Sequence, residues 1–252
     1  MKKEPLFVAL SNQKGGVGKS TLTVLLASYF HYYKGKNVLV VDCDYPQHSV
    51  KVMREWDVKN VEKNARLQSL LVEQFGNTGR KAYNILSSTP EQAKETAYDF
   101  IDKSDIEYDV VFVDLPGTVN TTGVFQSIIN MDYVFVPITQ ERMVMQSSMT
   151  FVLAVREYLF HHKEVPLRNI YMFWNKMDKR VSKNLYNAYT EIFCSLKLPV
   201  LDTVLPRAER YKKDVGLNGQ IFRSTLFPAS TTLLKDSNLD LLADELEKVL
   251  EF

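Results

Sequence analysis

The stretch SNQKGGVGKST, residues 11–21, decides the fold. It holds three glycines and two lysines, and it directly follows the apolar run LFVAL at residues 6–10. A phosphate-binding loop has the form G-x-x-x-x-G-K-[ST] between a strand and a helix, and Gly18, Lys19 and Ser20 fill its last three places. Because the apolar run TLTVLLASYF comes next, the strand and the helix that the motif requires are both expected. The stretch therefore predicts a loop that binds phosphate groups.

The chemistry of this loop comes from its backbone and from two side chains. Glycine tolerates positive φ, so N–H groups at Gly15, Gly16 and Gly18 can curl around a β-phosphate. The helix that opens at Lys19 adds its positive end. Lys19 would reach the β- and γ-phosphates, and the Ser20 hydroxyl would bind Mg²⁺. The alternative is an accidental glycine-rich turn, and the flanking strand and helix argue against it.

Length and composition limit the class of protein. The 252 residues suit one large α/β domain, which we expect to span residues 1–252. The net charge of +1 gives no overall field, so any DNA-binding surface would be a local patch. The two cysteines, Cys43 and Cys194, have no metal-site spacing. Neither a signal peptide nor a run of about 18 apolar residues is present, so we expect a cytoplasmic protein with no membrane-spanning segment.

Apolar runs of strand length alternate with helix-length segments along the chain. Nearly continuous Val/Ile/Phe runs are typical of strands that are covered on both faces. The pattern predicts an α/β fold with a doubly wound, mostly parallel sheet flanked by helices on both faces. The expected strands are 6–10, 37–42, 83–87, 109–114, 132–138, 170–174 and 200–205. The expected helices are 19–33, 61–75, 91–103, 121–130, 143–162, 181–196 and 237–251.

The loop departs from the general motif at one place. Position 13, where the motif has glycine, is Gln13, and Lys14 follows it. KGGVGKST is the deviant Walker A form, and the chain resembles the ParA/MinD superfamily of P-loop ATPases. The resemblance implies ATP and Mg²⁺ as cofactors and a homodimer in the ATP state. It also implies that Lys14 reaches phosphates bound by the partner, as an arginine finger does. A solvated loop lysine is the alternative.

The segment VDCDYPQHS, residues 41–49, resembles the first switch of that superfamily, usually D-x-D-P-Q. Here Tyr45 is an extra residue before the proline. The resemblance implies that Asp44 orients the attacking water and that Asp42 lies near the Mg²⁺ shell. Phosphoryl transfer needs a positioned nucleophile more than a strong base, which suits a carboxylate here. Either aspartate could instead cap the turn that follows.

The segment DVVFVDLPG, residues 109–117, is an apolar strand that ends in aspartate, which is the Walker B form. Asp114 would hold a Mg²⁺-bound water. Gly117 begins a segment resembling the second switch, and its N–H could reach a γ-phosphate. An aspartate at the end of an apolar strand is often only a turn residue, so the phosphate-binding loop gives this motif its weight.

Two later segments match positions where the superfamily binds the base. WNKMD (174–178) places Asn175 where relatives use an Asn side chain on adenine, and VLPRAER (204–210) places Pro206 at the start of a loop over the adenine. NKMD also matches the N-K-x-D guanine motif of GTPases. The resemblance as a whole favours ATP.

The resemblance thus implies three sets of site residues. The catalytic set is Lys14, Lys19 and Asp44. The metal set is Ser20, Asp42 and Asp114. The nucleotide set is Lys14, Gly15, Gly16, Val17, Gly18, Lys19, Ser20, Thr21, Gly117, Asn175 and Pro206.

The branches of the superfamily differ in what they carry. The nitrogenase iron-protein branch needs cluster cysteines, and this chain lacks them. The MinD branch ends in an amphipathic membrane helix with a basic face. Here the last helix has an acidic face opposite its apolar stripe, so we expect it to pack on the sheet. The stripe consists of Leu239, Leu242, Leu246 and Val249.

ParA-type DNA segregation proteins remain, and more narrowly the small ParA-family proteins of conjugative transposons called TraA. The resemblance implies non-specific DNA binding by the ATP dimer, association with the nucleoid, and a ParB-like or other protein that stimulates hydrolysis. The DNA-binding candidates are Arg207, Arg210, Lys212, Lys213 and Arg223, with a second cluster at Lys179, Arg180 and Lys183. Ordinary solvated surfaces are the alternative for each. A metabolic P-loop enzyme that activates a small carboxylate with ATP is the alternative function.

Overall fold

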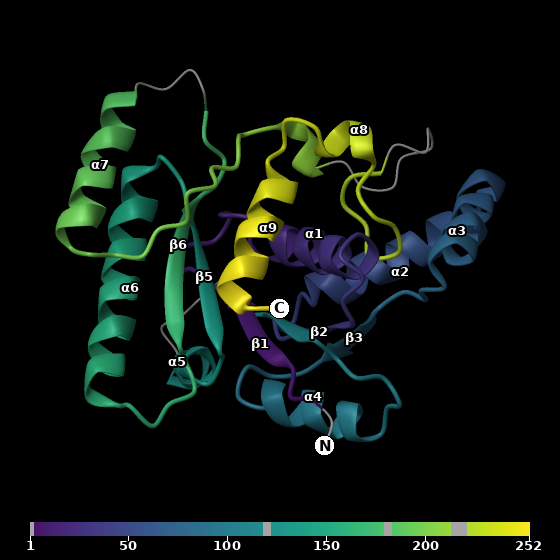
Figure 1. Ribbon diagram of the computed structural model, residues 1–252, viewed down its shortest axis with the longest axis horizontal. Helices are drawn as coiled ribbons and strands as arrows, with labels where there is room; N and C mark the ends of the chain where they lie inside the picture. Colours follow the sequence, from purple (N-terminus) through teal and green to yellow (C-terminus); the bar gives the residue numbers. More distant parts are fainter. Residues whose placement is uncertain (1–2, 118–121, 179–182, 213–220) are drawn as a thin grey trace.

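The structure is a computed structural model and describes residues 3–117, 122–178, 183–212 and 221–252. Over these residues, six parallel strands form one sheet in the order β3-β2-β4-β1-β5-β6 (Figure 1). This confirms the predicted doubly wound, mostly parallel α/β sheet. The strands are β1 Leu6–Leu10, β2 Val38–Asp42, β3 Asn84–Ser87, β4 Val110–Asp114, β5 Tyr133–Ile138 and β6 Asn169–Trp174.

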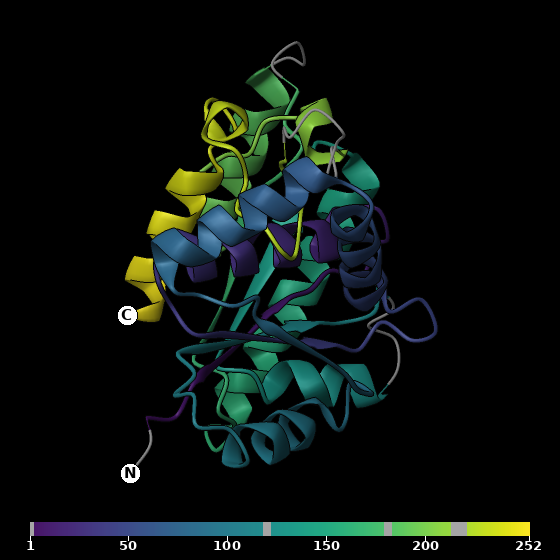
Figure 2. The same ribbon diagram turned by 90° about the vertical axis from the view of Figure 1, so that its right-hand side faces the viewer.

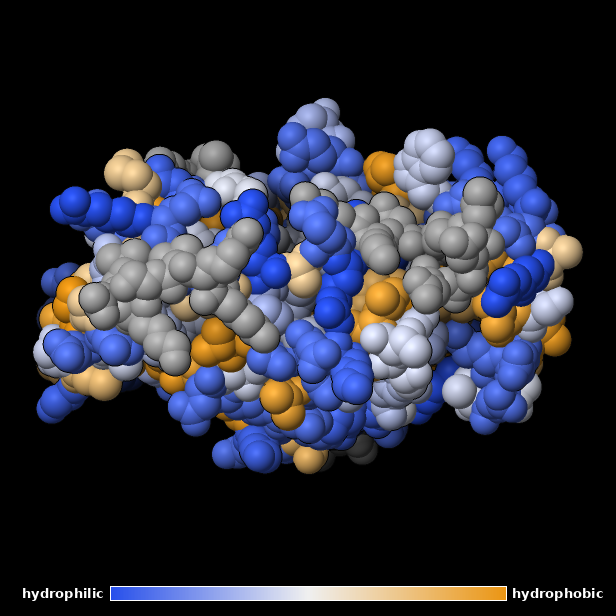
Figure 3. All heavy atoms as spheres, turned by 90° about the horizontal axis from the view of Figure 1, so that it is seen from above, coloured by the Kyte–Doolittle hydropathy of each residue, from blue (hydrophilic) through white to orange (hydrophobic). Residues whose placement is uncertain are grey.

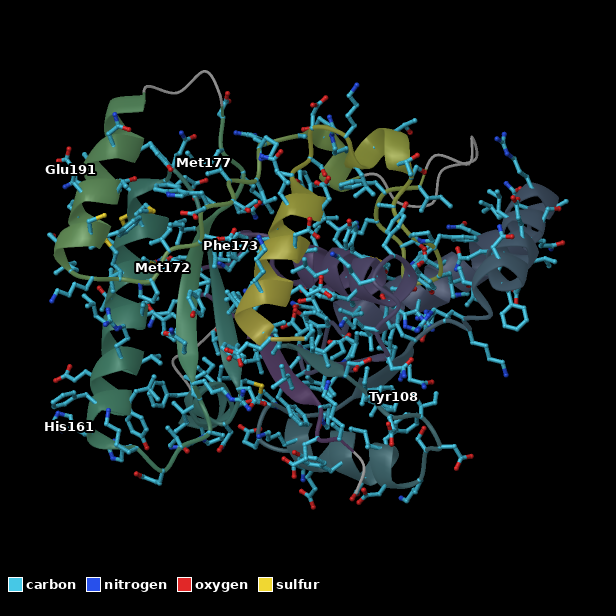
Figure 4. The ribbon with its side chains drawn as sticks, in the orientation of Figure 1. Tyr108, His161, Met172, Phe173, Met177 and Glu191 are labelled. Atoms are coloured by element: carbon cyan, nitrogen blue, oxygen red, sulfur yellow. The ribbon has the colours of Figure 1, made fainter. Side chains whose placement is uncertain are left out.

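The strands have this sequence pattern because both faces of the sheet are covered. Every residue of β2, β4 and β5 is buried. Successive residues of a strand point to opposite faces, so Met172 and Phe173 of β6 belong to two different hydrophobic clusters (Figure 4). A sheet of this kind needs helices on each side.

The helices lie in two layers above and below the sheet, as the edge-on view of Figure 2 shows. One layer consists of α1 Lys19–Tyr32, α2 Ser49–Glu62 and α9 Leu239–Leu250. The other consists of α4 Ala93–Asp102, α5 Thr122–Ile129 and α6 Arg142–His161. The remaining helices are α3 Ala65–Thr78, α7 Lys183–Ser195, the 3₁₀ helix Glu209–Lys212 and α8 Thr231–Leu234.

The register of the sheet brings three loops to one edge. Asp114 at the end of β4 pairs with Leu10 at the end of β1 and with Asp42 at the end of β2. Ligands of such open α/β sheets bind outside the carboxyl ends of the strands. The loops after β1, β2 and β4 therefore meet where the sequence motifs require them to meet.

The last helix packs on the sheet, as predicted. Leu239, Leu242 and Leu246 of α9 have no exposed surface and contact the cluster that includes β1, β2 and β4. The acidic face of α9 also makes ion pairs with α1: Lys34 lies 2.9 Å from Glu247. Among the described residues, no helix combines the length and apolarity that a membrane crossing requires.

Shortening Leu246 should therefore destabilise the protein. We expect Leu246→Ala to lower the free energy of unfolding by about 2–5 kcal/mol, because a buried side chain is lost and a cavity remains. Leu241 lies on the same helix and is 54 % exposed, so Leu241→Ala is the matched control and should change stability by less than about 0.5 kcal/mol. Urea denaturation measures both values. Equal losses for the two variants would contradict this packing.

Most predicted elements are confirmed within two residues at each end, but the strand predicted at 200–205 is wrong. This segment runs beside β6 and forms only an isolated bridge between Met172 and Val200. The N–H groups of Asp202 and Thr203 donate to the carboxylate of Glu245 on α9, at 2.7 and 2.9 Å. Because these N–H groups are taken by a side chain, they cannot extend the ladder.

The helix predicted at 61–75 was also wrong in its extent. The structure has α2 over residues 49–62 and α3 over residues 65–78. Asn64 separates them, since its side-chain oxygen accepts from the N–H groups of Arg66 and Leu67 at 3.0 and 3.3 Å. This is an ordinary N-cap for α3. The start of α2 was missed because the group that holds it, the Asp42 carboxylate, comes from the end of β2.

Candidate functional site

The loop between β1 and α1 has the conformation that its glycines allow. Gly16 and Gly18 have positive φ, +74° and +98°, and Gly18 is the left-handed residue from which α1 starts. A Cβ on Gly18 would lie 3.1 Å from Nδ2 of Asn175, whereas a Cβ on Gly15 or Gly16 would meet no atom within 4 Å. The loop is thus closed against the protein at Gly18 and open to a ligand at Gly15 and Gly16.

Lys19 is the buried cation of the site. It is 8 % exposed, and burial lowers its pKa below the ordinary value, while the carboxylates of Asp114 and Asp44 partly oppose that shift. A Cβ on Gly117 would lie 3.2 Å from Lys19 Nζ, so the segment after β4 lies against this ammonium group. A buried ammonium beside an open glycine loop and the start of a helix is suited to bind a polyanion.

Asp114 supplies a buried carboxylate with one uncommitted oxygen. Its Oδ1 accepts from Thr23 Oγ1 at 3.4 Å, and Ser20 also hydrogen-bonds to the carboxylate. Its Oδ2 has no hydrogen-bond partner. Burial, with the nearby charges of Asp42 and Asp44, raises its pKa to about 7, although the Ser20 hydrogen bond and Lys19 oppose the shift.

An unsatisfied buried carboxylate beside a serine hydroxyl fits Mg²⁺. Within the described ranges, no group of three or more His, Cys, Asp or Glu side chains could hold a metal ion by itself. Mg²⁺ does not need one, since it usually takes one or two carboxylates together with water and substrate phosphates. Ser20 and Asp114 therefore suit a magnesium ion that arrives with a nucleotide.

The two aspartates of the 41–49 segment have different surroundings. Asp42 is fully buried, and its Oδ2 accepts from the N–H groups of Val50 and Lys51, both at 3.0 Å. Its Oδ1 accepts from the N–H of Asp44 at 3.2 Å. Asp42 is thus the group that holds the loop and the start of α2.

Asp44 is half-buried and lies near the Lys19 ammonium. Burial raises the pKa of Asp44, the charge of Asp42 adds to the increase, and Lys19 and His48 oppose it. Tyr45, the residue that departs from the superfamily pattern, is 76 % exposed at the tip of the loop, and its ring meets His48 edge-on. The extra residue points outward and leaves Asp44 at the site.

A cavity of about 490 Å³ adjoins the phosphate loop. That volume suits a small ligand. Its wall includes Gly18 and Thr21 of the loop and of α1, together with Asn175 after β6. The Asn175 Nδ2 donates to the Val17 carbonyl at 2.8 Å, which fastens the end of β6 to the loop. Pro206 forms an isolated bridge with Met177, at the upper end of β6 in Figure 4, so the 206–211 segment follows β6 along the cavity.

The DNA-binding candidates are dispersed. Arg210 donates to the carbonyls of Leu233 and Lys235 at α8, and Arg223 donates to Thr21 Oγ1 at 2.9 Å. Arg207 is exposed and lines the cavity. The side chain of Lys212 lies outside the described residues, as do Lys213, Lys179, Arg180 and the side chain of Lys183. Hydrophilic residues cover most of the face seen from above Figure 1, which Figure 3 shows.

One residue that orients the loop was missed from the sequence. Asn12 is fully buried, and its Nδ2 donates to the Pro137 carbonyl and to Ser148 Oγ, both at 2.8 Å. Its Oδ1 accepts from the N–H of Lys14 at 2.9 Å. A polar residue directly after a buried strand was the available signal. The Lys14 side chain itself makes no hydrogen bond or ion pair with the part of the chain that the structure describes.

Removing the Asn12 side chain should loosen Lys14. We expect Asn12→Ala to lower the free energy of unfolding by about 1–3 kcal/mol, because buried hydrogen-bond partners are left unsatisfied. The amide of Lys14 should then exchange its hydrogen faster in a native-state exchange measurement. Asn130, whose side chain is exposed and bonds only within its own helix turn, provides the control Asn130→Ala. Unchanged exchange at Lys14 in Asn12→Ala would refute this role.

The parallel sheet, the phosphate loop, Lys19 and the strand-end aspartates define an α/β nucleotide-binding domain of the P-loop kind. The chain matches the CobQ/CobB/MinD/ParA nucleotide binding domain over residues 8–219, and it belongs to that family. A comparison with curated proteins gives no match.

Solved structures show the same fold at low sequence identity. A ParA family ATPase from Chlorobium tepidum is 17 % identical, with a TM-score of 0.61 and coverage of 96 % of this chain and 98 % of that one. A plasmid partition protein from Borrelia burgdorferi, bound to AMPPNP, is 18 % identical, with a TM-score of 0.59 and coverage of 98 % and 100 %. Cobyrinic acid a,c-diamide synthase from Mycobacterium smegmatis, with an ATP analogue and magnesium, is 19 % identical, with a TM-score of 0.56 and coverage of 86 % and 91 %.

Proposed function

We propose that this protein is a Mg²⁺-dependent ATPase of the ParA type. In this proposal ATP closes two copies into a dimer, the dimer binds DNA non-specifically, and hydrolysis releases it to segregate or maintain a plasmid or conjugative element. The observation that carries the proposal is the pair of lysines. Lys19 is buried between two carboxylates, whereas the Lys14 side chain makes no hydrogen bond or ion pair with the described residues.

Phosphate binding is the role of the loop and of Lys19. The N–H groups at Gly15, Gly16 and Gly18 bind oxygens of the phosphate chain, and Lys19 supplies a positive charge at the β- and γ-phosphates. Ser20 and Asp114 hold Mg²⁺, which when bound neutralises the phosphate oxygens. The Asp42 oxygens are engaged by backbone N–H groups, so Asp42 acts on the metal through its charge and by holding the loop.

Hydrolysis needs a positioned water molecule. Asp44 orients it from the loop after β2, and the N–H of Gly117 binds the γ-phosphate from the loop after β4. Lys14 of the partner subunit completes the site, as a cation that stabilises the charge developing on the transferred group. Each subunit is therefore incomplete alone.

The cavity beside Asn175 receives the base. We infer adenine, with Asn175 and the loop from Pro206 beside it, and two of the similar structures contain ATP analogues. The cargo and the stimulating protein belong to the same proposal, which the plasmid partition proteins of the same fold support. Arg207, Lys212 and Lys213 remain the DNA-binding candidates.

One experiment tests this function. Hydrolysis of ATP and of GTP is measured with and without non-specific duplex DNA, over a range of salt concentrations, with light scattering to follow dimer formation. We expect DNA-stimulated ATP hydrolysis, and binding to DNA that weakens by roughly 0.9 log units per log unit of salt for each phosphate contact. Lys19→Ala should bind no ATP. Turnover that requires a small carboxylic acid and ignores DNA would favour a carboxylate-activating enzyme.

A further inference from the structure

The segment 221–229 brings an arginine to the nucleotide cavity from far along the chain. Arg223 lines the cavity together with Gly18 and Thr21, and its Nη1 donates to Thr21 Oγ1 at 2.9 Å. Thr21 follows Ser20 in the first turn of α1. The guanidinium therefore lies one hydroxyl group away from the helix end that faces the phosphates.

The position of Arg223 lies between the two ends of the proposed nucleotide. Lys19 serves the β- and γ-phosphates, and Asn175 serves the base. The phosphate next to the ribose, the α-phosphate, must then lie where the phosphate loop meets the cavity. Gly18, Thr21 and Arg223 meet at this place. An arginine, with five N–H donors in a planar fork, suits phosphate oxygens and ribose hydroxyls.

The two residues after Arg223 are held by a buried carboxylate. Asp57 of α2 is 2 % exposed. Its Oδ2 accepts from Ser224 Oγ at 3.0 Å, from Thr225 N at 2.7 Å and from Thr225 Oγ1 at 2.7 Å. Burial of an aspartate is costly unless it is well hydrogen-bonded, and here three donors satisfy one oxygen.

Arg54, one turn before Asp57, completes this network. It donates to Thr225 Oγ1 at 2.8 Å, to the Thr225 carbonyl at 3.0 Å and to the Tyr83 carbonyl at 2.9 Å. From α1, Ser28 Oγ donates to the Ser224 carbonyl at 2.6 Å. The backbone next to Arg223 is thus fixed to α1, α2 and the start of β3. A connected and satisfied polar network of this kind holds a segment in one position.

We propose that Arg223 is a nucleotide-binding residue that contacts the α-phosphate or the ribose, and that Asp57 is the positioning residue that holds it there through Ser224 and Thr225. This rests on the proposed function, and it gives Arg223 a role in place of DNA binding. The same network joins Arg223 to α2, whose first turn is held by Asp42 beside Asp44. Nucleotide contact at Arg223 and the position of the Asp44 loop are then linked through one helix.

The test is nucleotide binding without DNA, by calorimetric titration of ATP and ADP. We expect Arg223→Gln to raise Kd about 10- to 100-fold for both nucleotides, since both have an α-phosphate, and Arg223→Lys to recover part of the affinity. Arg66→Gln is the control, because Arg66 is exposed on α3 and that helix does not line the cavity. Its Kd should equal that of the wild type.

Asp57 is tested by a double-mutant cycle. We expect Asp57→Asn to raise Kd about 3- to 10-fold in the wild-type background and to have no further effect in Arg223→Gln, because it acts through Arg223. A merely structural role would lower affinity equally in both backgrounds, which would overturn the positioning role. Thermal melting of each variant confirms that the folded protein is titrated.

The outcomes separate the two proposals. A wild type that binds neither ATP nor ADP overturns the proposed function and this inference with it. A wild type that binds both, with Arg223→Gln indistinguishable from Arg66→Gln, overturns the inference alone. Loss of DNA binding in Arg223→Gln with unchanged nucleotide affinity would return Arg223 to the DNA surface.

Discussion

Lys14→Ala is expected to lower DNA-stimulated ATP hydrolysis by about 10³-fold or more while ATP binding is retained. A cation supplied across a dimer to the transferred phosphoryl group contributes about 10³–10⁵ in rate. Asn12 fixes the backbone of Lys14, and no described residue accepts its side chain. The side chain is thus placed at the mouth of the site without a local role, as a residue that acts on a partner subunit should be.

Rates of hydrolysis and binding of ATP are measured for the wild type, Lys14→Ala and the control Lys63→Ala, an exposed lysine between α2 and α3. Action in trans is tested by mixing Lys14→Ala with Asp44→Ala. Each variant alone should be inactive. In a mixed dimer, the Lys14→Ala subunit keeps its own Asp44 and receives Lys14 from its partner, so turnover should return. If mixing restores nothing, or if Lys14→Ala hydrolyses ATP like Lys63→Ala, the trans role is refuted.

The parts of the site that could be predicted from sequence are those made of contiguous residues. Gly18, Lys19 and Ser20 form one turn, and the structure places them at the start of α1 with Lys19 buried. Asp114 and Asp44 end their strands at the same edge because the sheet is parallel. The topology therefore followed from the alternation of apolar runs, and the topology in turn brought the motifs together.

The parts that were missed depend on contacts between distant residues. Asp42 holds the start of α2, and the resemblance gave it only a place near the metal. Arg223 reaches Thr21 across 202 positions, and Asp57 reaches Thr225 across 168. The strand predicted at 200–205 failed because Glu245 takes its N–H groups. Local patterns cannot show which distant side chain will satisfy a backbone group.

Asp114→Asn is expected to stabilise the nucleotide-free protein at pH 8 and to abolish magnesium-dependent turnover. The pKa of Asp114 rises from 3.8 to about 7 in the folded chain. A folded-state pKa above the unfolded value means that the protonated carboxyl favours folding. This contribution is fully present below about pH 4 and is lost as the pH rises through about 7. Charging the buried carboxylate between pH 5 and 8 thus costs on the order of 2–4 kcal/mol.

The measurement is urea denaturation of the wild type and Asp114→Asn at pH 5, 6, 7 and 8, without nucleotide. The neutral amide has no charge to bury, so the variant should gain about 2–4 kcal/mol over the wild type at pH 8 and little at pH 5. Asp105→Asn, at an exposed position, should show no pH-dependent difference. ATP with Mg²⁺ should stabilise the wild type and not Asp114→Asn, because a bound metal ion compensates the same charge. A difference between Asp114→Asn and wild type that stays constant with pH would contradict a strained carboxylate, whereas the expected slope would show that stability is lost where the metal is to be held.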